Sequence, residues 1–291
     1  MTGSIVAIVT PMKGGRIDKE AYRRLVEFQV ENKTSAILTC GCTGEPATMS
    51  MEEHHELIDY TLKIVDGRVH HVMAGTGSNN TREAVELSRY AQKAGADSVL
   101  LITPYYNKPT QKGLLLHYQE VAANISIPLI LYNVPSRTGI SISPETVLEL
   151  SRVKNIAGIK EASGNLDQVS QIVSSCREDF IVFSGDDSLT LPIISVGGKG
   201  VISVAANIIP AQVAEMVDAA LSNRWNEARR IHLDMFPVFK VLFVETNPIP
   251  VKTALWLMKM AEMEWRLPLT GPSAENIKKI RSVLKSRGVI T

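Results

Sequence analysis

Several features that would point to particular protein classes are scarce in this 291-residue chain. It has only three cysteines, Cys40, Cys42 and Cys176, an odd number whose spacing matches no zinc site. A disulfide framework is therefore not expected, and a reducing cytoplasm fits better than secretion. No apolar run approaches the roughly 18 residues of a membrane span, and no charged leader precedes an apolar core at the start. The sequence predicts a cytoplasmic protein.

An excess of charge of one sign is also missing. The 31 basic and 30 acidic residues give a formal net charge of +1, and no basic run stands out. Binding to nucleic acid or to an anionic membrane surface therefore does not fit the composition. With 45% hydrophobic residues, the chain has enough apolar side chains for a large core.

Short apolar, β-branched runs alternate along the chain with longer stretches of helical spacing. Gly95 is typical of a helix end, and Ser143 followed by Pro144 is typical of a helix start. The runs that predict strands are 5–9, 36–39, 72–74, 98–102, 129–131, 156–159, 181–183 and 201–204.

Eight strands alternating with helices predict an α/β protein with a closed parallel (β/α)₈ TIM barrel. A doubly wound open sheet is the alternative, although no dinucleotide-binding fingerprint follows the first strand. Roughly 85 residues follow the eighth strand, more than one barrel helix needs. We predict a barrel domain over 1–224, closed by a helix over 210–221, and a C-terminal helical extension over 225–291. The helices of the extension are expected at 226–239, 251–264 and 274–286.

Lys160 ends the apolar run 156–159. Burying an unpaired ammonium is costly, so a lysine is rarely placed there for stability. A lysine whose pKa is lowered by desolvation can instead attack a ketone and hold it as a Schiff base. The structural alternative is a lysine paired with Glu161 or Asp186.

Tyr132 and Arg137 follow the preceding strand, and catalytic groups of a barrel collect at the C-terminal ends of its strands. A phenol at this place can transfer protons, and a guanidinium can grip a carboxylate at two points. Thr43 and Gly44 can present a hydroxyl and backbone N–H groups to a second carboxylate. The structural alternative is that Tyr132 is a core tyrosine and Arg137 a surface residue on a loop. Together these residues indicate a keto-acid enzyme.

Two further motifs are predicted to be structural. The glycine-rich segment 197–200 resembles a phosphate cradle but precedes a strand, which places it on the opposite face of the barrel. The acidic and histidine run 52–56 resembles a metal cluster, but adjacent helix residues do not share a face. His70 and His71 also precede a strand. No metal site is expected.

Seven motifs in order resemble a known family. From about Gly3 to its C-terminus the chain is similar to the dihydrodipicolinate synthase family of pyruvate-dependent class I aldolases. The motifs that carry this resemblance are 41–45, 104–109, 132–139, 158–162, 184–187, 200–203 and 245–252.

The resemblance implies a reaction that needs no cofactor. Pyruvate would form a Schiff base with Lys160, become an enamine and attack the aldehyde of L-aspartate 4-semialdehyde, in the route to diaminopimelate and lysine. Tyr132 would handle protons. Pyruvate and semialdehyde would be bound by Thr43, the backbone of Ile202, Gly185 and Arg137. Tyr106 would complete the proton relay from a neighbouring subunit, which implies at least a dimer, and the family is usually a homotetramer.

Cys42 departs from the family pattern, which has a threonine there to link the two tyrosines. A thiol is a weaker donor and acceptor than a hydroxyl and ionises nearer to neutral pH. We expect a slower or more pH-sensitive relay, with simple space filling by Cys42 as the alternative.

Many members of the family are inhibited by lysine at a subunit interface. Here Ala47, His54, Asn79, Glu83 and Tyr105 fit the sensitive pattern, whereas Pro46 and Met51 depart from it. This mixed set implies weak to moderate inhibition.

Two other functions remain open. Sugar-acid aldolases such as sialic-acid lyases share the lysine and the tyrosine, but they generally lack the ending Ser-Arg-Thr-Gly found at 136–139. A barrel without catalytic activity, acting as a sensor or scaffold, is the second alternative.

Overall fold

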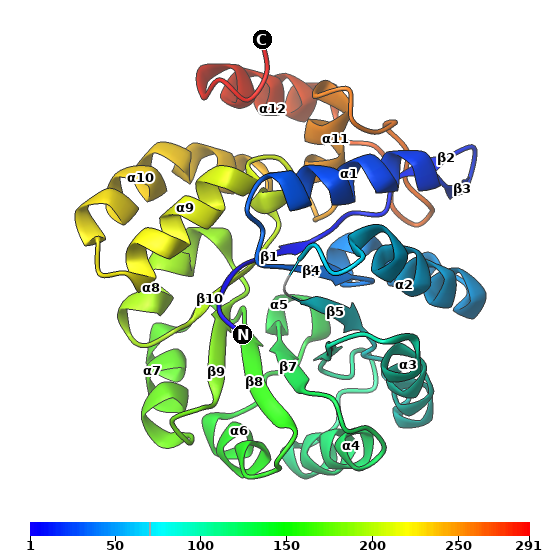
Figure 1. The fold of residues 1–291 in the computed structure, drawn as a ribbon, viewed down its shortest axis with the longest axis vertical. Coiled ribbons are helices and arrows are strands. Elements are labelled where there is room, and N and C mark those ends of the chain that lie inside the picture. Colours follow the sequence, from blue (N-terminus) through cyan, green and yellow to red (C-terminus); the bar gives the residue numbers. More distant parts are fainter. Residues whose placement is uncertain (70) are drawn as a thin grey trace.

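The computed structural model describes residues 1–69 and 71–291, so His70 lies outside the described residues. Eight parallel strands close into a barrel with the order β1-β10-β9-β8-β7-β6-β5-β4, which confirms the predicted α/β barrel (Figure 1). The strands are β1 (Gly3–Ala7), β4 (Ala36–Thr39), β5 (Val72–Gly75), β6 (Ser98–Ile102), β7 (Leu129–Asn133), β8 (Ile156–Glu161), β9 (Ile181–Ser184) and β10 (Gly200–Ser203).

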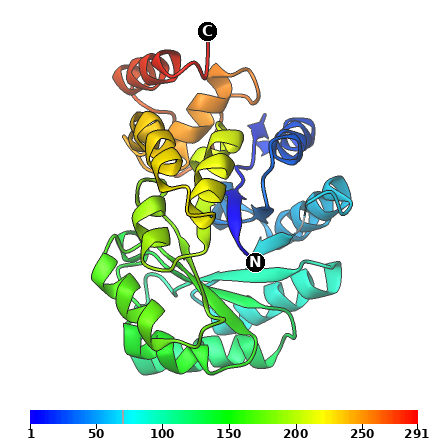
Figure 2. The ribbon, with the colours of Figure 1, turned by 60° about the vertical axis from the view of Figure 1, so that its left-hand side comes forward.

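Helices surround the barrel and connect its strands (Figure 2). Gly95, with φ +103°, ends one helix, and Ser143 caps another by accepting from Thr146 N, both as expected. The helices that follow barrel strands are α1 (Lys19–Glu31), α2 (Met51–Val65), α3 (Thr81–Ala94), α4 (Gln111–Ala123), α5 (Pro135–Thr138), α6 (Pro144–Ser151), α7 (Leu166–Ser175), α8 (Thr190–Ser195) and α9 (Pro210–Leu221).

Successive side chains along each strand point to opposite faces of the barrel wall, so one set packs against the helices and the other fills the barrel interior. In β7, Leu129 and Leu131 pack with the surrounding helices, whereas Ile130 and Tyr132 belong to the cluster inside the barrel. Tyr132 is the register partner of Lys160 on β8, so the two side chains leave their strands at the same level. The β-strand period therefore turns the lysine inward at the end of its strand.

The first strand differs from its expected bounds. We expected 5–9, but β1 ends at Ala7, because the N–H of Val9 donates to the Asn207 side chain at 3.0 Å. A short hairpin, β2 (Met12–Lys13) with β3 (Arg16–Ile17), follows and was not expected. The segment 197–200 lies between α8 and β10, as predicted for a connecting turn.

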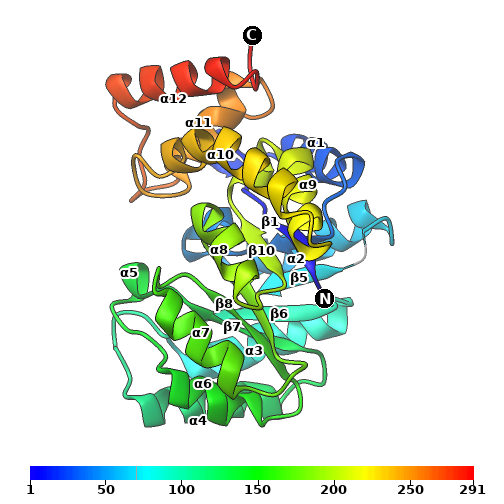
Figure 3. The same ribbon diagram turned by 90° about the vertical axis from the view of Figure 1, so that its left-hand side faces the viewer.

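The C-terminal region contains α10 (Trp225–Val241), α11 (Ile249–Leu257) and α12 (Ala274–Ser286). In Figure 3, α10 lies beside α9, and α11 and α12 lie above them at the end of the molecule that carries the C-terminus. The predicted helix over 251–264 is wrong at both ends. It ends at Leu257 because Lys259 adopts a left-handed φ of +61° and the N–H of Met260 returns to Leu255 O at 2.9 Å. The apolar spacing continues past this point, so the sequence pattern does not show the end of the helix.

A helix that crosses a lipid bilayer is long and predominantly apolar. Within residues 1–69 and 71–291, none combines the length and the apolar character that crossing a membrane requires.

Candidate active site

Lys160 lies at the end of β8 with only 4% of its surface exposed. Its Nζ is 4.3 Å from the centroid of the Tyr132 ring. Among the described residues it forms no ion pair, unlike the buried Lys252, which pairs with Glu45. The Glu161 carboxylate accepts instead from Asn133 Nδ2 at 3.0 Å. The pairing of Lys160 with Glu161 or Asp186, considered from the sequence, is therefore not formed.

Burial sets the protonation of this pair. Desolvation lowers the pKa of Lys160 from 10.5 to about 8, partly opposed by Cys42 and Asp187. At a pKa of about 8, roughly one lysine in ten is neutral at pH 7. Desolvation raises the pKa of Tyr132, with a further contribution from the adjacent Cys42. The site thus holds a partly neutral amine beside a protonated phenol.

Thr43 and Arg137 are joined by a residue to which we had assigned no role. Thr43 belongs to the 3₁₀ turn η1 (Cys42–Gly44), which follows β4. Its Oγ1 accepts from Asn247 Nδ2 at 3.0 Å. Arg137, on α5 after β7, donates from Nη2 to the backbone O of Asn247 at 2.9 Å. Asn247 comes from the segment before α11, so the C-terminal region completes the site.

A cavity of about 330 Å³ opens at this rim of the barrel. It brings together five residues predicted from the sequence, Lys160, Tyr132, Thr43, Arg137 and Gly185, with Asn247 beside them. Gly185 has a steric reason to lack a side chain. A Cβ there would lie 3.1 Å from Lys160 Cε and 2.7 Å from Ala162 Cβ.

Three predicted residues do not line this cavity. The Ile202 side chain is fully buried inside the barrel, and Val204 lines the cavity in its place. Tyr106 is 90% exposed on the single chain. Cys42 faces a neighbouring, larger cavity, although its sulfur is close enough to affect the pKa values of both Tyr132 and Tyr105.

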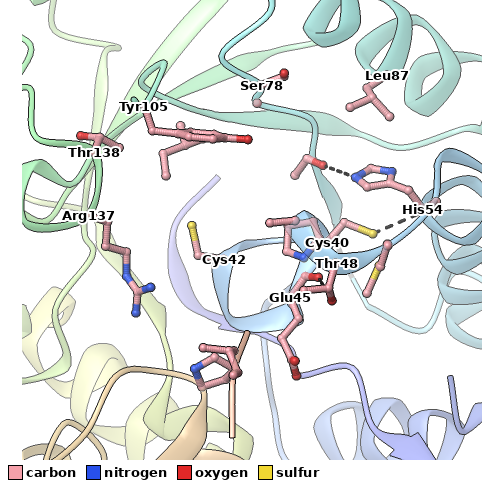
Figure 4. Close-up of a pocket in the computed structure, with 18 of the residues that line it drawn as sticks. Cys40, Cys42, Glu45, Thr48, His54, Ser78, Leu87, Tyr105, Arg137 and Thr138 are labelled. Carbon is pink, nitrogen blue, oxygen red and sulfur yellow. Dashed lines mark hydrogen bonds between the residues drawn. The ribbon is translucent and has the colours of Figure 1, made fainter. Parts of the chain in front are cut away.

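The larger cavity has a volume of about 560 Å³ and adjoins the first, because Arg137 and Asn247 line both. In Figure 4 the Cys42 thiol and the Arg137 side chain extend into the space below the Tyr105 ring. Of the predicted lysine-binding residues, the cavity contains Ala47, His54, Glu83 and Tyr105.

Asn79 is not among the residues that line this larger cavity. Its side chain instead donates to Tyr105 O at 3.2 Å. It therefore supports a wall residue of the larger cavity.

Glu45, which lines the larger cavity, belongs to a buried ion pair. Lys252 Nζ on α11 donates to Glu45 Oε1 at 2.6 Å, and both side chains are almost fully buried. Glu45 directly follows η1 in a left-handed conformation with φ +60°. Both residues lie in motifs of the family resemblance, which was the one sequence signal that could have drawn attention to them.

The run 52–56 makes separate contacts. Glu53 binds Arg266, His54 Nε2 bonds Gly75 O, and Glu56 pairs with Lys19. Nowhere in residues 1–69 and 71–291 do three or more potential metal ligands gather. His71 bonds Ser98 Oγ before β5, while the prediction for His70 falls outside the described residues.

The fold and the site together define a class of protein: an enzyme of the class I aldolase type, with its lysine at the rim of a (β/α)₈ barrel. The model of the dihydrodipicolinate synthetase family matches residues 1–287. The chain belongs to this family.

Known proteins similar to this chain support that assignment. A 4-hydroxy-tetrahydrodipicolinate synthase of Nitratidesulfovibrio vulgaris is 50% identical over 290 residues, 99% of either chain. The crystal structure of dihydrodipicolinate synthase from Aquifex aeolicus superposes with a TM-score of 0.98 at 51% identity, covering 99% of both chains.

Two further solved structures contain ligands. The chloride-inhibited enzyme of Acinetobacter baumannii, complexed with pyruvate, has a TM-score of 0.97 and 42% identity. The enzyme of Cyanidioschyzon merolae with lysine bound has a TM-score of 0.96 and 39% identity. Each comparison covers 99% of both chains.

Proposed function

We propose that this enzyme condenses pyruvate with L-aspartate 4-semialdehyde, the reaction of 4-hydroxy-tetrahydrodipicolinate synthase. One observation supports this above all others. A buried Lys160, which has no ion-pair partner among the described residues, shares a cavity with a phenol, a hydroxyl and a guanidinium. The similar A. baumannii enzyme, solved with pyruvate, agrees with a keto-acid substrate.

The chemistry begins at the lysine. Neutral Lys160 Nζ bonds to the ketone carbon of pyruvate, and the ketone oxygen leaves as water, giving an imine. Loss of a methyl proton forms the enamine, whose carbon bonds to the aldehyde carbon of the second substrate. Attack by that substrate's own amine on the imine carbon then closes the ring and releases Lys160. Tyr132 moves the protons, and no cofactor is required.

The two carboxylates are assigned to opposite sides of the cavity. Thr43 binds the carboxylate of pyruvate close to Lys160, with the backbone of Ile202 supporting it from β10, whereas the N–H of Gly44 donates to Gly41 O within the turn. Arg137, exposed at the mouth, binds the semialdehyde carboxylate in two places. Gly185 leaves room for the methylene groups of the lysine.

Borohydride trapping tests the proposal. Incubation with pyruvate and borohydride should add one reduced pyruvate to Lys160, found by mass spectrometry of the digested protein, and Lys160→Ala should abolish it. Assay with the semialdehyde should then show turnover. A missing adduct would refute Schiff-base catalysis, and an adduct without semialdehyde turnover would favour a sugar-acid aldolase.

We also infer that L-lysine regulates the enzyme from the larger cavity. Glu83 can attract an ammonium there, and the similar C. merolae enzyme has been solved with lysine bound. Pro46 and Met51 line the same cavity and offer no polar side chain, so inhibition should be weak to moderate. A titration without effect at millimolar lysine would refute this.

Assembly and location complete the proposal. We infer a homotetramer built from dimers, in which Tyr106 reaches the cavity of a neighbouring subunit; its 90% exposure on the single chain supports this. A cytoplasmic location is supported by the cysteines, since Cys40, Cys42 and Cys176 are all free thiols.

A further inference from the structure

Asn247 is the one described residue that hydrogen-bonds both carboxylate-binding side chains of the proposed site, Thr43 and Arg137. We propose that its side chain is a positioning group for pyruvate, because it directs the hydroxyl proton of Thr43 toward the substrate carboxylate. This inference depends on the proposed function and assigns a role to a residue outside the reacting groups.

The polarity of the contact carries the inference. The Asn247 amide nitrogen can only donate, so Thr43 Oγ1 accepts at 3.0 Å. Within residues 1–69 and 71–291, Thr43 Oγ1 has no other hydrogen-bond partner, so its proton has no protein acceptor. Thr43 is 3% exposed and lines the smaller cavity beside Lys160. Its proton is therefore free to meet an anionic group bound there.

The backbone of Asn247 is held in place beside the site. Asn247 is 5% exposed, and its backbone O accepts from Arg137 at 2.9 Å. Pro248 directly follows Asn247, and its backbone O accepts from the Lys252 N–H at 3.0 Å. The Lys252 side chain binds Glu45, which lies two residues after Thr43. The backbone segments that carry the amide and the hydroxyl are thus held together, whereas the side-chain oxygen of Asn247 has no hydrogen-bond partner among the described residues.

The two contacts of Asn247 predict that a substitution affects the binding of the two substrates differently. Its side chain contacts the residue assigned to pyruvate, whereas its backbone carbonyl holds the arginine assigned to the aldehyde. A side-chain substitution leaves the carbonyl in place. It should therefore weaken pyruvate binding and leave aldehyde binding nearly unchanged, a split that general loosening of the site would not produce.

Steady-state kinetics of the full-length enzyme test this. Asn247→Ala should raise the KM for pyruvate about tenfold, the effect of losing one hydrogen bond to an anion-binding group, with the aldehyde KM within about twofold of the parent. Asn247→Asp, of the same shape, can only accept and would draw the Thr43 proton away from the substrate. Its pyruvate KM should rise further than that of the alanine variant.

A double-mutant cycle supplies the decisive comparison. In a Thr43→Val background, Asn247→Ala should have little further effect on pyruvate KM, because the group it positions is gone. Asn155→Ala is the matched control: its amide donates to Ala122 O and Ile125 O before β8, at the opposite face. It should lower thermal stability without changing either KM.

Three results would overturn the role of Asn247: an unchanged pyruvate KM in a folded Asn247→Asp variant, an equal rise in both KM values, or a full effect in the Thr43→Val background. Circular dichroism establishes which variants fold. A parent enzyme that forms no pyruvate adduct would instead refute the proposed function itself.

Discussion

At the scale of single residues, the chemistry depends on where a charge is left without a partner. Two lysines, Lys160 and Lys252, are buried in the part of the chain that the structure describes. Lys252 is neutralised by Glu45, whereas Lys160 has no carboxylate partner among the described residues and faces Tyr132. Burial lowers the pKa of both amines, but the ion pair opposes that effect at Lys252. The same physical cost is therefore offset by an ion pair at Lys252, whereas at Lys160 it leaves a partly neutral amine, as the proposed Schiff-base chemistry requires.

The pH dependence of Schiff-base formation follows from Lys160. Its pKa is lowered from 10.5 to about 8, and the neutral amine is the nucleophile. The rate of pyruvate adduct formation should therefore rise from pH 6 and level off above a midpoint near 8. Rapid-mixing trapping with borohydride at each pH measures it. A profile still rising steeply at pH 9 would contradict the lowered pKa.

Cys42→Thr tests the unusual thiol. The sulfur lies near both Tyr132 and Tyr105, and a hydroxyl in its place is the stronger hydrogen-bonding group. We expect the variant to have a higher kcat with a flatter pH profile, measured with saturating substrates. Cys176→Ser, at the end of α7 away from the cavities, is the control and should match the parent. Identical kcat profiles of the parent and Cys42→Thr would show that the thiol only fills space.

At the scale of elements, the site depends on a contact between segments far apart in the chain. The turn after β4 carries Thr43 and Glu45, and α11 carries Lys252, more than 200 residues later. The buried ion pair holds these two segments together under the cavities. The C-terminal region is therefore part of the active-site scaffold, and the boundary predicted at 224/225 does not separate the site from it.

Lys252→Met should destabilise the protein strongly. It leaves the Glu45 carboxylate buried without its partner, a change that typically costs about 3–5 kcal/mol. Urea unfolding followed by circular dichroism measures the loss, and adding Glu45→Leu should restore part of it. Arg82→Met removes an exposed ion pair with Glu86 on α3 and should change stability little. Equal effects of Lys252→Met and Arg82→Met would contradict the importance of the buried pair.

At the scale of the whole molecule, the isolated chain leaves one predicted catalytic residue outside its site. Tyr106 has a left-handed φ of +69° and is 90% exposed, although an aromatic ring of this size is usually covered. Its neighbour Tyr105 reaches the larger cavity, so the segment is placed next to the site but turned away from it. A second copy of the chain would give the exposed ring a contact.

Mixing inactive variants tests whether Tyr106 acts across subunits. Lys160→Ala and Tyr106→Phe protomers, unfolded and refolded together, should form hybrid dimers with one intact site. Up to about a quarter of the parental activity should return under random pairing. Lys160→Ala mixed with Tyr132→Phe is the control and should recover nothing, since both changes affect the same chain's site. No recovery in either mixture would place Tyr106 outside the partner's site.

Much of the fold and of the site could be predicted from local patterns. The alternation of apolar runs with helical stretches led to the barrel, and the rule that catalytic groups follow barrel strands led to Lys160, Tyr132, Thr43, Arg137 and Gly185. The barrel is confirmed and the five residues share one cavity, because each of these predictions depends on the position of a residue within its own strand or loop; the roles assigned to the five residues stay predictions. The end of β1, which a distant residue sets, and the end of α11, where a local left-handed turn interrupts the apolar spacing, were misplaced.

The sequence by itself determined the kind of chemistry, because the type of a residue and its position in a strand can both be read from the neighbouring sequence. Only the tertiary structure decided which groups are buried, paired or free. Within the described residues it left Lys160 without a carboxylate partner, paired Lys252 with Glu45, and placed Asn247 between Thr43 and Arg137. Such contacts join residues more than 100 positions apart, and hydrogen bonds and desolvation depend on distance in space, which no local pattern records.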